Sequence, residues 1–383
     1  MGNAELLGDV PRLRPRPAAR AGRPLRGRLA AACCGMLLVP LPSPAADGEA
    51  ADAYLERVRT LAGHVAGGTM ETRRTTAALL RGMGKPVLQY LEAELKAPET
   101  GRRARAALVL GEIGEPAAFP ALREALQDPD GPVRAQAAAA IGKLGLEGAP
   151  AVLAPLLDDP NESARAEAVR VMGELRMPEH TGKIRRLLSD PSEKVRACAL
   201  AAAGNLRDKE SVPAALKAIE EPSARVRNSA AIALGKIGDR AALPRLRKAL
   251  EDSDAWVRSS AAAALGEMGD ADAVPLIEKA AGDETPHVRG AAAAALGALK
   301  APRSIPALCA LLQDSNPSGF SLLVPYRRTE VREEAAEALG KITGDARGFS
   351  RTADPASREE ALERWRAWCL DRTATPLPGT GPP

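Results

Sequence analysis

The chain has 383 residues, of which 45% are hydrophobic but only 2% are aromatic, with three each of Trp, Tyr and Phe. A single core of that size normally uses many more aromatic side chains, so close packing of small residues must dominate. The formal charge is +4, but the segment 1–46 carries +5 and the remaining residues carry −1. The body of the chain therefore lacks the positive charge typical of nucleic-acid binding, and we expect no nucleic-acid partner.

The first 46 residues have the layout of a secretory signal. An arginine-rich stretch up to Arg28 precedes an apolar run from Leu29 to Leu41, and small residues follow that run. The run is too short to span a bilayer. We therefore expect a cleaved leader, an exported protein (periplasmic or extracellular) and no membrane span. The alternative is an uncleaved basic tail on a cytoplasmic protein.

An arginine followed by a glycine eight residues later recurs nine times. Successive arginines are separated by 29 residues, then by 31 residues six times, and finally by 43. A fixed period indicates a solenoid of repeated units, and the last interval is one unit with a 12-residue insertion within about 315–330. The repeat arginines are Arg74, Arg103, Arg134, Arg165, Arg196, Arg227, Arg258, Arg289 and Arg332.

Each unit has the pattern of two helices. In the seventh unit Val257, Ala261 and Leu265 follow the spacing i, i+4 and i+8, which predicts an amphipathic second helix. Gly266 falls in its last turn, where the missing Cβ would permit either the close approach of a neighbouring helix or an early helix end. Pro244 lies near the start of the first helix, where N–H groups have no intrahelical partner.

An acidic residue precedes the repeat arginine by six positions in most units. We expect this acid to cap the start of the second helix, and to alternate with the arginines as a ladder between stacked units. Such pairing would leave the arginines unavailable to phosphate groups. The acids are Asp128, Asp159, Asp190, Glu221, Asp252 and Asp283.

The residues from Asp252 to Gly269 follow the pattern D-x-x-x-x-V-R-x-x-A-A-x-A-L-G-x-x-G, and several of its columns recur over residues 52–344. This pattern resembles the short HEAT repeats of the phycobilisome-lyase type, which are common in bacteria. The resemblance implies an all-α fold, an α-solenoid (superhelix) of about nine HEAT-like, armadillo-like helix pairs. It also implies a binding or scaffolding role, or alternatively a bilin (chromophore) lyase or chaperone-like protein.

The C-terminal region departs from the repeat. The sequence Ile342-Thr343-Gly344 followed by Glu359–Trp368 resembles a segment that closes some exported bacterial HEAT arrays. We expect the tryptophans of this segment to cover the bare end of the last repeat. The predicted organisation is a leader (1–46), a solenoid (47–344), a loop with a capping helix (345–372) and a disordered tail (373–383).

Residues suited to catalysis are scarce. None of the three histidines stands in a metal-ligand spacing, and neither a G-x-S-x-G motif nor a P-loop lysine is present. Glu179-His180 is a single acid–His pair, whereas the HEAT-type iron hydroxylases need several. We therefore expect no catalytic residue, no metal and no cofactor. Cys198, Cys309 and Cys369 show no C-x-x-C spacing, and we expect each to be a small buried hydrophobic residue.

These features predict a non-catalytic scaffold or adaptor, a monomeric solenoid that binds protein partners. The position two residues before the repeat arginine should form a partly exposed ridge at the starts of the second helices. The insertion adds aromatic and basic residues to a chain that is otherwise poor in aromatic residues, and Trp, Tyr and Arg dominate binding hot spots. The alternative is that Trp256 packs on its neighbour and the insertion is a passive flap. The predicted partner-binding residues are Arg225, Trp256, His287, Phe320, Tyr326, Arg327 and Arg328.

Overall fold

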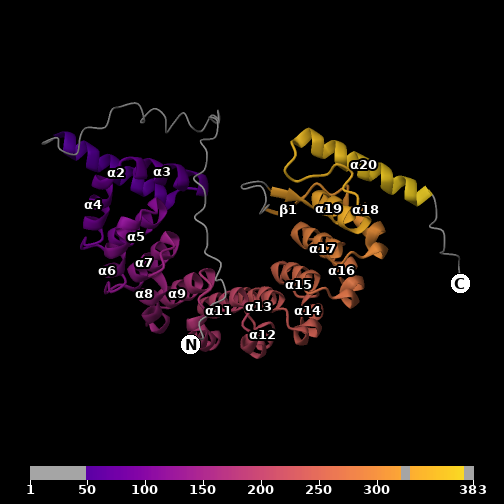
Figure 1. Cartoon of the computed structure of the whole chain (residues 1–383), viewed down its shortest axis with the longest axis horizontal. Helices are drawn as coiled ribbons and strands as arrows, with labels where there is room; N and C mark the ends of the chain where they lie inside the picture. Colours follow the sequence, from indigo (N-terminus) through magenta and orange to yellow (C-terminus); the bar gives the residue numbers. More distant parts are fainter. Residues whose placement is uncertain (1–48, 321–327, 375–383) are drawn as a thin grey trace, which may run out of the picture. The chain divides into compact units, whose positions relative to one another are not determined.

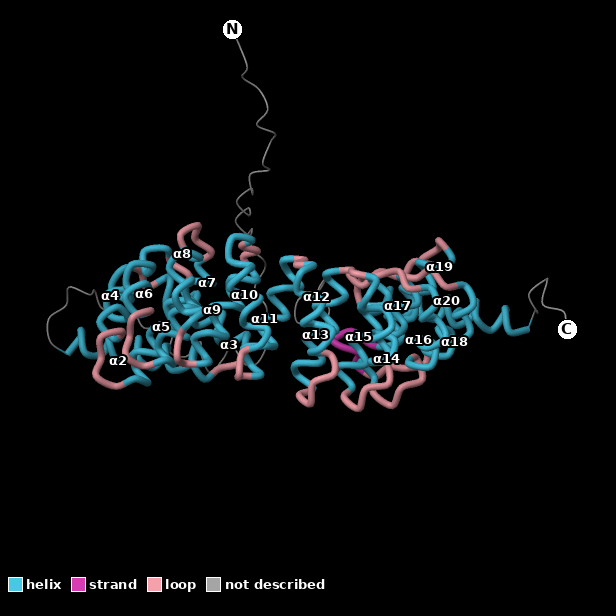
Figure 2. Tube along the Cα trace, turned by 90° about the horizontal axis from the view of Figure 1, so that it is seen from below, coloured by secondary structure: helices cyan, strands magenta, loops and turns pink. Residues whose placement is uncertain are grey.

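The structure is a computed structural model that describes residues 49–320 and 328–374. Within these ranges the chain is mainly helical (Figures 1 and 2). The backbone contacts divide the chain into residues 1–56 and residues 57–383, so nearly all of the described structure belongs to the second unit. No helix in the described ranges is both long enough and apolar enough to cross a bilayer. The predicted leader, the centre of the insertion and nearly all of the predicted tail lie outside the described residues.

The predicted all-α solenoid is confirmed, because the described residues form nine successive helix pairs. The first helices are α2 (Glu49–Gly67), α4 (Lys85–Glu94), α6 (Phe119–Ala125), α8 (Ala149–Leu153), α10 (Thr181–Arg186), α12 (Val212–Ala218), α14 (Leu243–Ala249), α16 (Val274–Ala280) and α18 (Ile305–Leu311). The second helices are α3 (Met70–Gly82), α5 (Thr100–Ile113), α7 (Gly131–Leu144), α9 (Glu162–Glu174), α11 (Glu193–Leu206), α13 (Ala224–Ile237), α15 (Ala255–Glu267), α17 (Pro286–Ala298) and α19 (Val331–Thr343).

Short 3-10 turns adjoin the first helices from α6 onward. A proline occupies the first turn of most of these helices, as the sequence predicted, because the first N–H groups need no intrahelical acceptor. The turns are η1 (Pro116–Ala118), η2 (Ala154–Asp158), η3 (Pro178–His180), η4 (Leu187–Ser189), η5 (Lys209–Ser211), η6 (Arg240–Ala242), η7 (Ala271–Ala273) and η8 (Pro302–Ser304).

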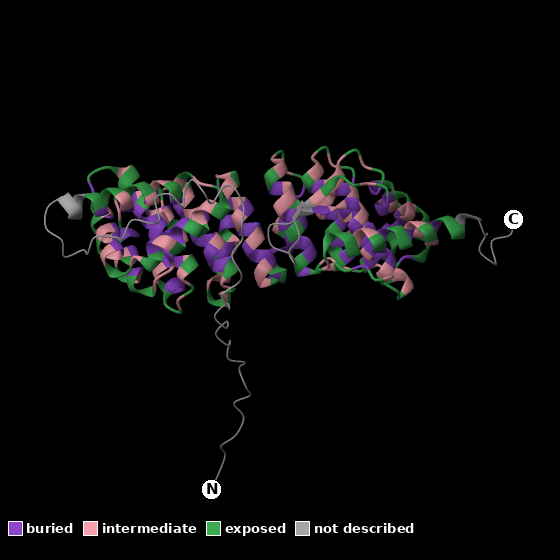
Figure 3. Cartoon of the chain, turned by 90° about the horizontal axis from the view of Figure 1, so that it is seen from above, coloured by how far each residue is buried: buried purple, intermediate pink, exposed green. Residues whose placement is uncertain are grey.

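The second helices pack side by side in chain order from α5 to α19 (Figure 1). Their buried residues are mostly Ala, Val and Leu, and they lie inside the helical layers (Figure 3). Gly266 shows why these helices come so close, because a Cβ built on it would lie only 2.8 Å from the Cα of Ala295 in the next unit. The close approach at this glycine is confirmed, and it shows how second helices rich in small residues pack together with few aromatic side chains.

The predicted ladder of acids and arginines is present. Each repeat arginine from α5 to α17 pairs with the acid of the following unit, and its Nη1 also donates to two backbone carbonyls of its own unit. The pairs are Arg103–Asp128, Arg134–Asp159, Arg165–Asp190, Arg196–Glu221, Arg227–Asp252, Arg258–Asp283 and Arg289–Asp314.

The expected capping role of these acids is wrong. Asp252 accepts a hydrogen bond from the N–H of Asp254, two residues on, and it is Asp254 that caps α15 by accepting from the N–H groups of Trp256 and Val257. The acid therefore fixes the loop before the helix, while the capping residue satisfies the free N–H groups of the first turn.

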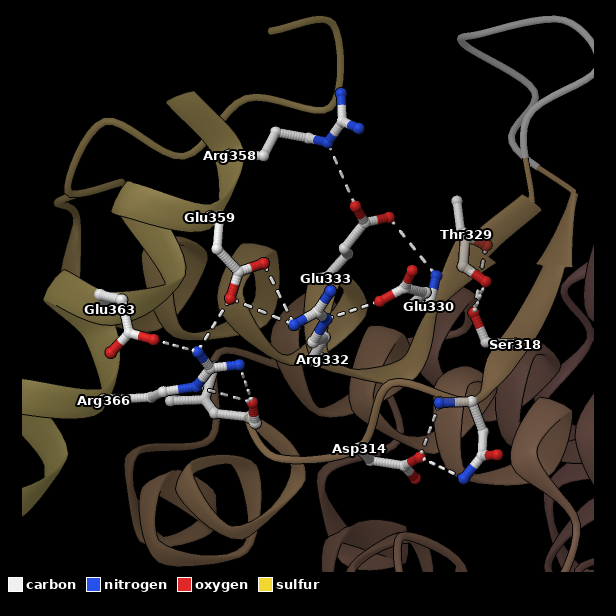
Figure 4. Close-up of polar contacts among 12 residues, drawn as sticks. Asp314, Ser318, Thr329, Glu330, Arg332, Glu333, Arg358, Glu359, Glu363 and Arg366 are labelled. Atoms are coloured by element: carbon white, nitrogen blue, oxygen red, sulfur yellow. Dashed lines mark hydrogen bonds and ion pairs between the residues drawn. The ribbon is translucent and has the colours of Figure 1, made fainter. Parts of the chain in front are cut away.

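A final helix, α20 (Pro355–Ala374), packs against α18 and α19 and caps the array. Its Trp365 is fully buried. Arg332 has no tenth unit to pair with, and it contacts Glu330 and, 3.1 Å away, Glu359 of α20 instead (Figure 4). Arg366 of α20 donates through its Nη2 to the carbonyl oxygen of Leu312 at 3.0 Å. The cap thus supplies the polar partners that a further repeat would supply.

Two of the cysteines correct the expectation of isolated buried thiols. Cys309 of α18 and Cys369 of α20 form a disulfide across 60 residues of chain. Spacing alone did not reveal this pair, because it depends on α20 folding back over α18. Cys198 remains a free, half-buried thiol in α11.

The insertion begins and ends as a short antiparallel hairpin, with β1 (Pro317–Phe320) paired to β2 (Arg328–Glu330). The hairpin packs on α17, where a Cβ on Gly290 would collide with the side chain of Ser318. The hydroxyl of Ser318 also donates to the carbonyl oxygen of Thr329 at 3.1 Å (Figure 4). The base of the insertion is therefore fixed to the eighth unit.

Candidate partner-binding face

The second helices bury one side in the array and leave the other side accessible. In α15, Trp256, Ala263 and Glu267 are exposed and Ser260 is half-buried, at the spacing i, i+4, i+7 and i+11, while Ala261, Ala262, Ala264 and Leu265 are buried. This spacing places the four residues on one side of the helix. We term the corresponding four positions of each second helix the exposed face.

The character of the exposed face changes along the array. In α9 it is charged, and Arg170 is paired with both Glu167 and Glu174. From α11 to α17, which we term the central face, small and uncharged residues predominate. The central face consists of Lys194, Cys198, Ala201, Asn205, Arg225, Ser229, Ile232, Lys236, Trp256, Ser260, Ala263, Glu267, His287, Ala291, Ala294 and Ala298.

Trp256 and His287 meet on the central face, as their place in one repeat column predicted. Their ring centroids are 4.2 Å apart with an interplanar angle of 24°, which is a stacked arrangement. Trp256 nevertheless remains 62% exposed, whereas His287 is half-buried. Within the described residues the buried Nε2 of His287 has no hydrogen-bond partner. The stack therefore presents a broad aromatic surface to solvent.

A second pair of neighbouring units is joined in the same column, nearer the N-terminus. Lys194 donates from Nζ to the hydroxyl of Ser163 in the preceding unit at 3.0 Å, so neighbouring members of the column contact each other there too. Arg225, between Lys194 and Trp256 in unit order, is exposed. The column thus forms a ridge along the N-terminal ends of the second helices.

Three cations of the central face lack a carboxylate partner within the described part of the chain. They are Lys194, Arg225 and Lys236, and Lys236 donates to the neutral Oδ1 of Asn205 at 2.8 Å. Each repeat arginine from α5 to α17, by contrast, is engaged in the ladder. The arginines that recur most regularly in the sequence are therefore structural, while the cations that differ from unit to unit are accessible.

Cys198 is a member of the central face that the sequence analysis did not assign to it. Burial raises the pKa of its thiol, and the nearby Arg225 charge lowers that pKa by a smaller amount. The thiol is therefore held in its protonated form at neutral pH. Ile232 is 36% exposed and was likewise not predicted as a site residue, because the sequence pattern did not indicate that its position is accessible.

The insertion residues of the predicted site are only partly covered by the structure. Tyr326 and Arg327 lie outside the described residues, and for Phe320 and Arg328 the described part is the strand backbone. The hairpin does pack on α17, the helix that carries His287. The contribution of these four residues to binding stays a prediction.

Open hollows lie elsewhere on the surface of the described residues. One has a volume of about 580 Å³ and is lined by residues of α4 and α6, including Glu92 and Glu124. The other lies around Tyr90, whose pKa is raised chiefly by burial. Neither hollow includes a residue of the central face. No group of three or more His, Cys, Asp or Glu side chains within the described ranges is arranged to hold a metal ion.

The chain can be placed in a class by its nine helix pairs, its continuous row of second helices and its ladder. This architecture is an α-solenoid. The family model for HEAT repeats matches residues 88–173, 150–219, 183–266 and 246–321, which together make up more than half of the chain. The protein therefore belongs to the HEAT-repeat family. A search of curated proteins gave no match.

Several solved structures are similar. YibA of Escherichia coli is 19% identical with a TM-score of 0.50, over 70% of this chain and 95% of YibA. The CpcE–CpcF complex of phycocyanin lyase from Nostoc is 20% identical with a TM-score of 0.36, over 74% and 94%. Human deoxyhypusine hydroxylase is 22% identical with a TM-score of 0.30, over 65% and 98%. At these identities YibA supports the fold alone, and we draw no functional conclusion from the other two.

Proposed function

We propose that this HEAT-repeat protein is a non-catalytic scaffold that binds a protein partner through its central face. The observation that carries the proposal is Trp256, which is 62% exposed yet held by stacking on His287. An exposed tryptophan with a fixed orientation loses little conformational freedom on binding and buries much apolar area. The alanines and serines beside it are small, so that a partner can approach the helices closely.

The flanks of the central face support this location. On the α9 side Arg170 is neutralised by two glutamates. On the α19 side Glu334 and Glu337 are covered by Arg351 from the loop before α20. The charged groups of both flanks are therefore paired within the chain, whereas the central face between them retains accessible apolar and cationic groups.

Export is part of the proposal. Disulfides persist in oxidising compartments and are rare in the cytosol, so the Cys309–Cys369 bond favours a periplasmic or extracellular location. The predicted leader at residues 1–46 is consistent with that location. Fusing residues 1–46 to a phosphatase reporter that folds only outside the cytoplasm tests it. A silent reporter would contradict export.

The binding proposal is tested by a photo-crosslinking amino acid at Ala263 of the full chain, in cells that naturally produce it. We expect adducts at this position, and we expect Trp256→Ala to reduce them at least about tenfold. The matched control places the same amino acid at Leu370, which is 70% exposed on α20. Equal labelling at both positions, or adducts unaffected by Trp256→Ala, would contradict binding at the central face.

A further inference from the structure

The central face carries a net positive charge beside the exposed Trp256. Its charged residues are Lys194, Arg225 and Lys236 against Glu267, a formal charge of +2 with His287 neutral. None of these cations forms an ion pair with another described residue. The carboxylate closest in sequence to Trp256 is that of Asp254, and it is occupied in capping α15.

The arrangement of these groups suits an extended chain. Lys194, Arg225, Trp256 and His287 follow one another in successive units along the ridge, and alanines and serines lie beside them. Packed helices are about 8 to 10 Å apart, so the path from α11 to α17 is about 24 to 30 Å long. An extended polypeptide covers that distance with about seven to nine residues.

We propose that the central face binds an extended acidic polypeptide segment along this ridge, with carboxylates toward Lys194 and Arg225 and an apolar side chain against the Trp256–His287 stack. The inference rests on the proposed function, and it adds the chemistry of the partner. The carboxylates supply the charge that the unpaired cations lack, and the apolar side chain covers the tryptophan. The small residues of α15 and α17 leave room for the partner's backbone.

The test is a selection from a random library of nine-residue peptides, using the immobilised full chain at about 150 mM salt. We expect enriched peptides to combine Asp or Glu with a central apolar residue. Trp256→Ala should weaken their binding at least about tenfold. Lys194→Glu with Arg225→Glu should shift the selection toward Lys and Arg peptides, because the charge along the ridge is then reversed. Arg240→Glu is the matched control, because Arg240 is an exposed arginine of η6 outside the central face.

Each other outcome overturns the inference. Neutral or basic enriched peptides, no enrichment, or a selection that ignores the charge reversal would exclude an acidic segment. Binding to anionic lipid vesicles or to a single-stranded oligonucleotide that is tighter than to the peptides, and is lost with Arg225→Glu, would assign the cations to a different partner. If adducts at Ala263 persist in either case, the scaffold proposal stands and only the partner chemistry fails. If those adducts are also absent, both proposals fail.

Discussion

Removing one arginine of the ladder gives the sharpest test of how the array is held together. Arg227 forms two hydrogen bonds to the carboxylate of Asp252, at 2.7 and 2.8 Å. It also donates to the carbonyl oxygens of Glu221 and Pro222, at 2.9 and 2.8 Å. Arg227→Ala removes all four interactions and leaves the carboxylate of Asp252, only 13% exposed, without its cation.

The expected loss follows from that geometry. Breaking a buried ion pair by removing one partner costs about 3 to 5 kcal/mol, and the pair here is slightly exposed, so we expect the low end of that range. The matched control is Arg225→Ala, two residues away in the same helix but exposed, which should change the unfolding free energy by no more than about 0.5 kcal/mol. Arg227→Lys should lie between them, because an ammonium cannot reproduce the fork of the guanidinium.

The assay is urea unfolding followed by circular dichroism, together with the double variant Arg227→Ala, Asp252→Ala. The two single variants should be strongly non-additive, with a coupling energy of about 1 to 3 kcal/mol. A coupling energy near zero, or an Arg227→Ala variant as stable as the Arg225→Ala control, would show that the ladder does not hold the units together.

Three further predictions concern acid, the cap and helix packing. Burial raises the pKa of Asp252, but its hydrogen bonds with Arg227 and the N–H of Asp254 outweigh burial and lower that pKa overall. Such acids stabilise the fold above their unfolded pKa of about 3.9, and this stabilisation is lost as the pH falls through the lower folded pKa. The free energy of unfolding measured in urea should therefore decline below about pH 4, and the decline should be shallower in Asp252→Asn. The Cys309–Cys369 disulfide closes a 60-residue loop, which stabilises the folded chain by about 4 kcal/mol in the chain-entropy description. Reduction should therefore expose α20 to proteolysis at a much lower urea concentration. A thiol assay that finds both cysteines free before reduction would contradict the disulfide. Gly266→Val should lower the free energy of unfolding by about 1 to 3 kcal/mol, as measured by thermal unfolding. The control Gly63→Ala should not lower it, because a Cβ at Gly63 meets no atom within 4 Å.

The candidate site divides between what the repeat period determines and what it does not. The period places Trp256 and His287 one unit apart in the same column, so the sequence predicted that they would be neighbours. The stacked geometry and the exposure of Trp256 depend on how the rings settle at the helix starts, which no periodicity specifies. The sequence likewise could not show that Arg225 lacks a carboxylate partner among the described residues, because this depends on which cations the nearby acids pair with in the folded chain.

The sequence by itself determined the architecture of this protein. In a solenoid each unit contacts only its neighbours, so a 31-residue period is enough to predict the helix pairs, the close approach at Gly266 and the ladder. The tertiary structure alone decided what breaks the period, namely the Cys309–Cys369 bond and the pairing of Arg332 with Glu359. Both contacts depend on the return of α20 over the last units, which leaves no repeated signal in the chain.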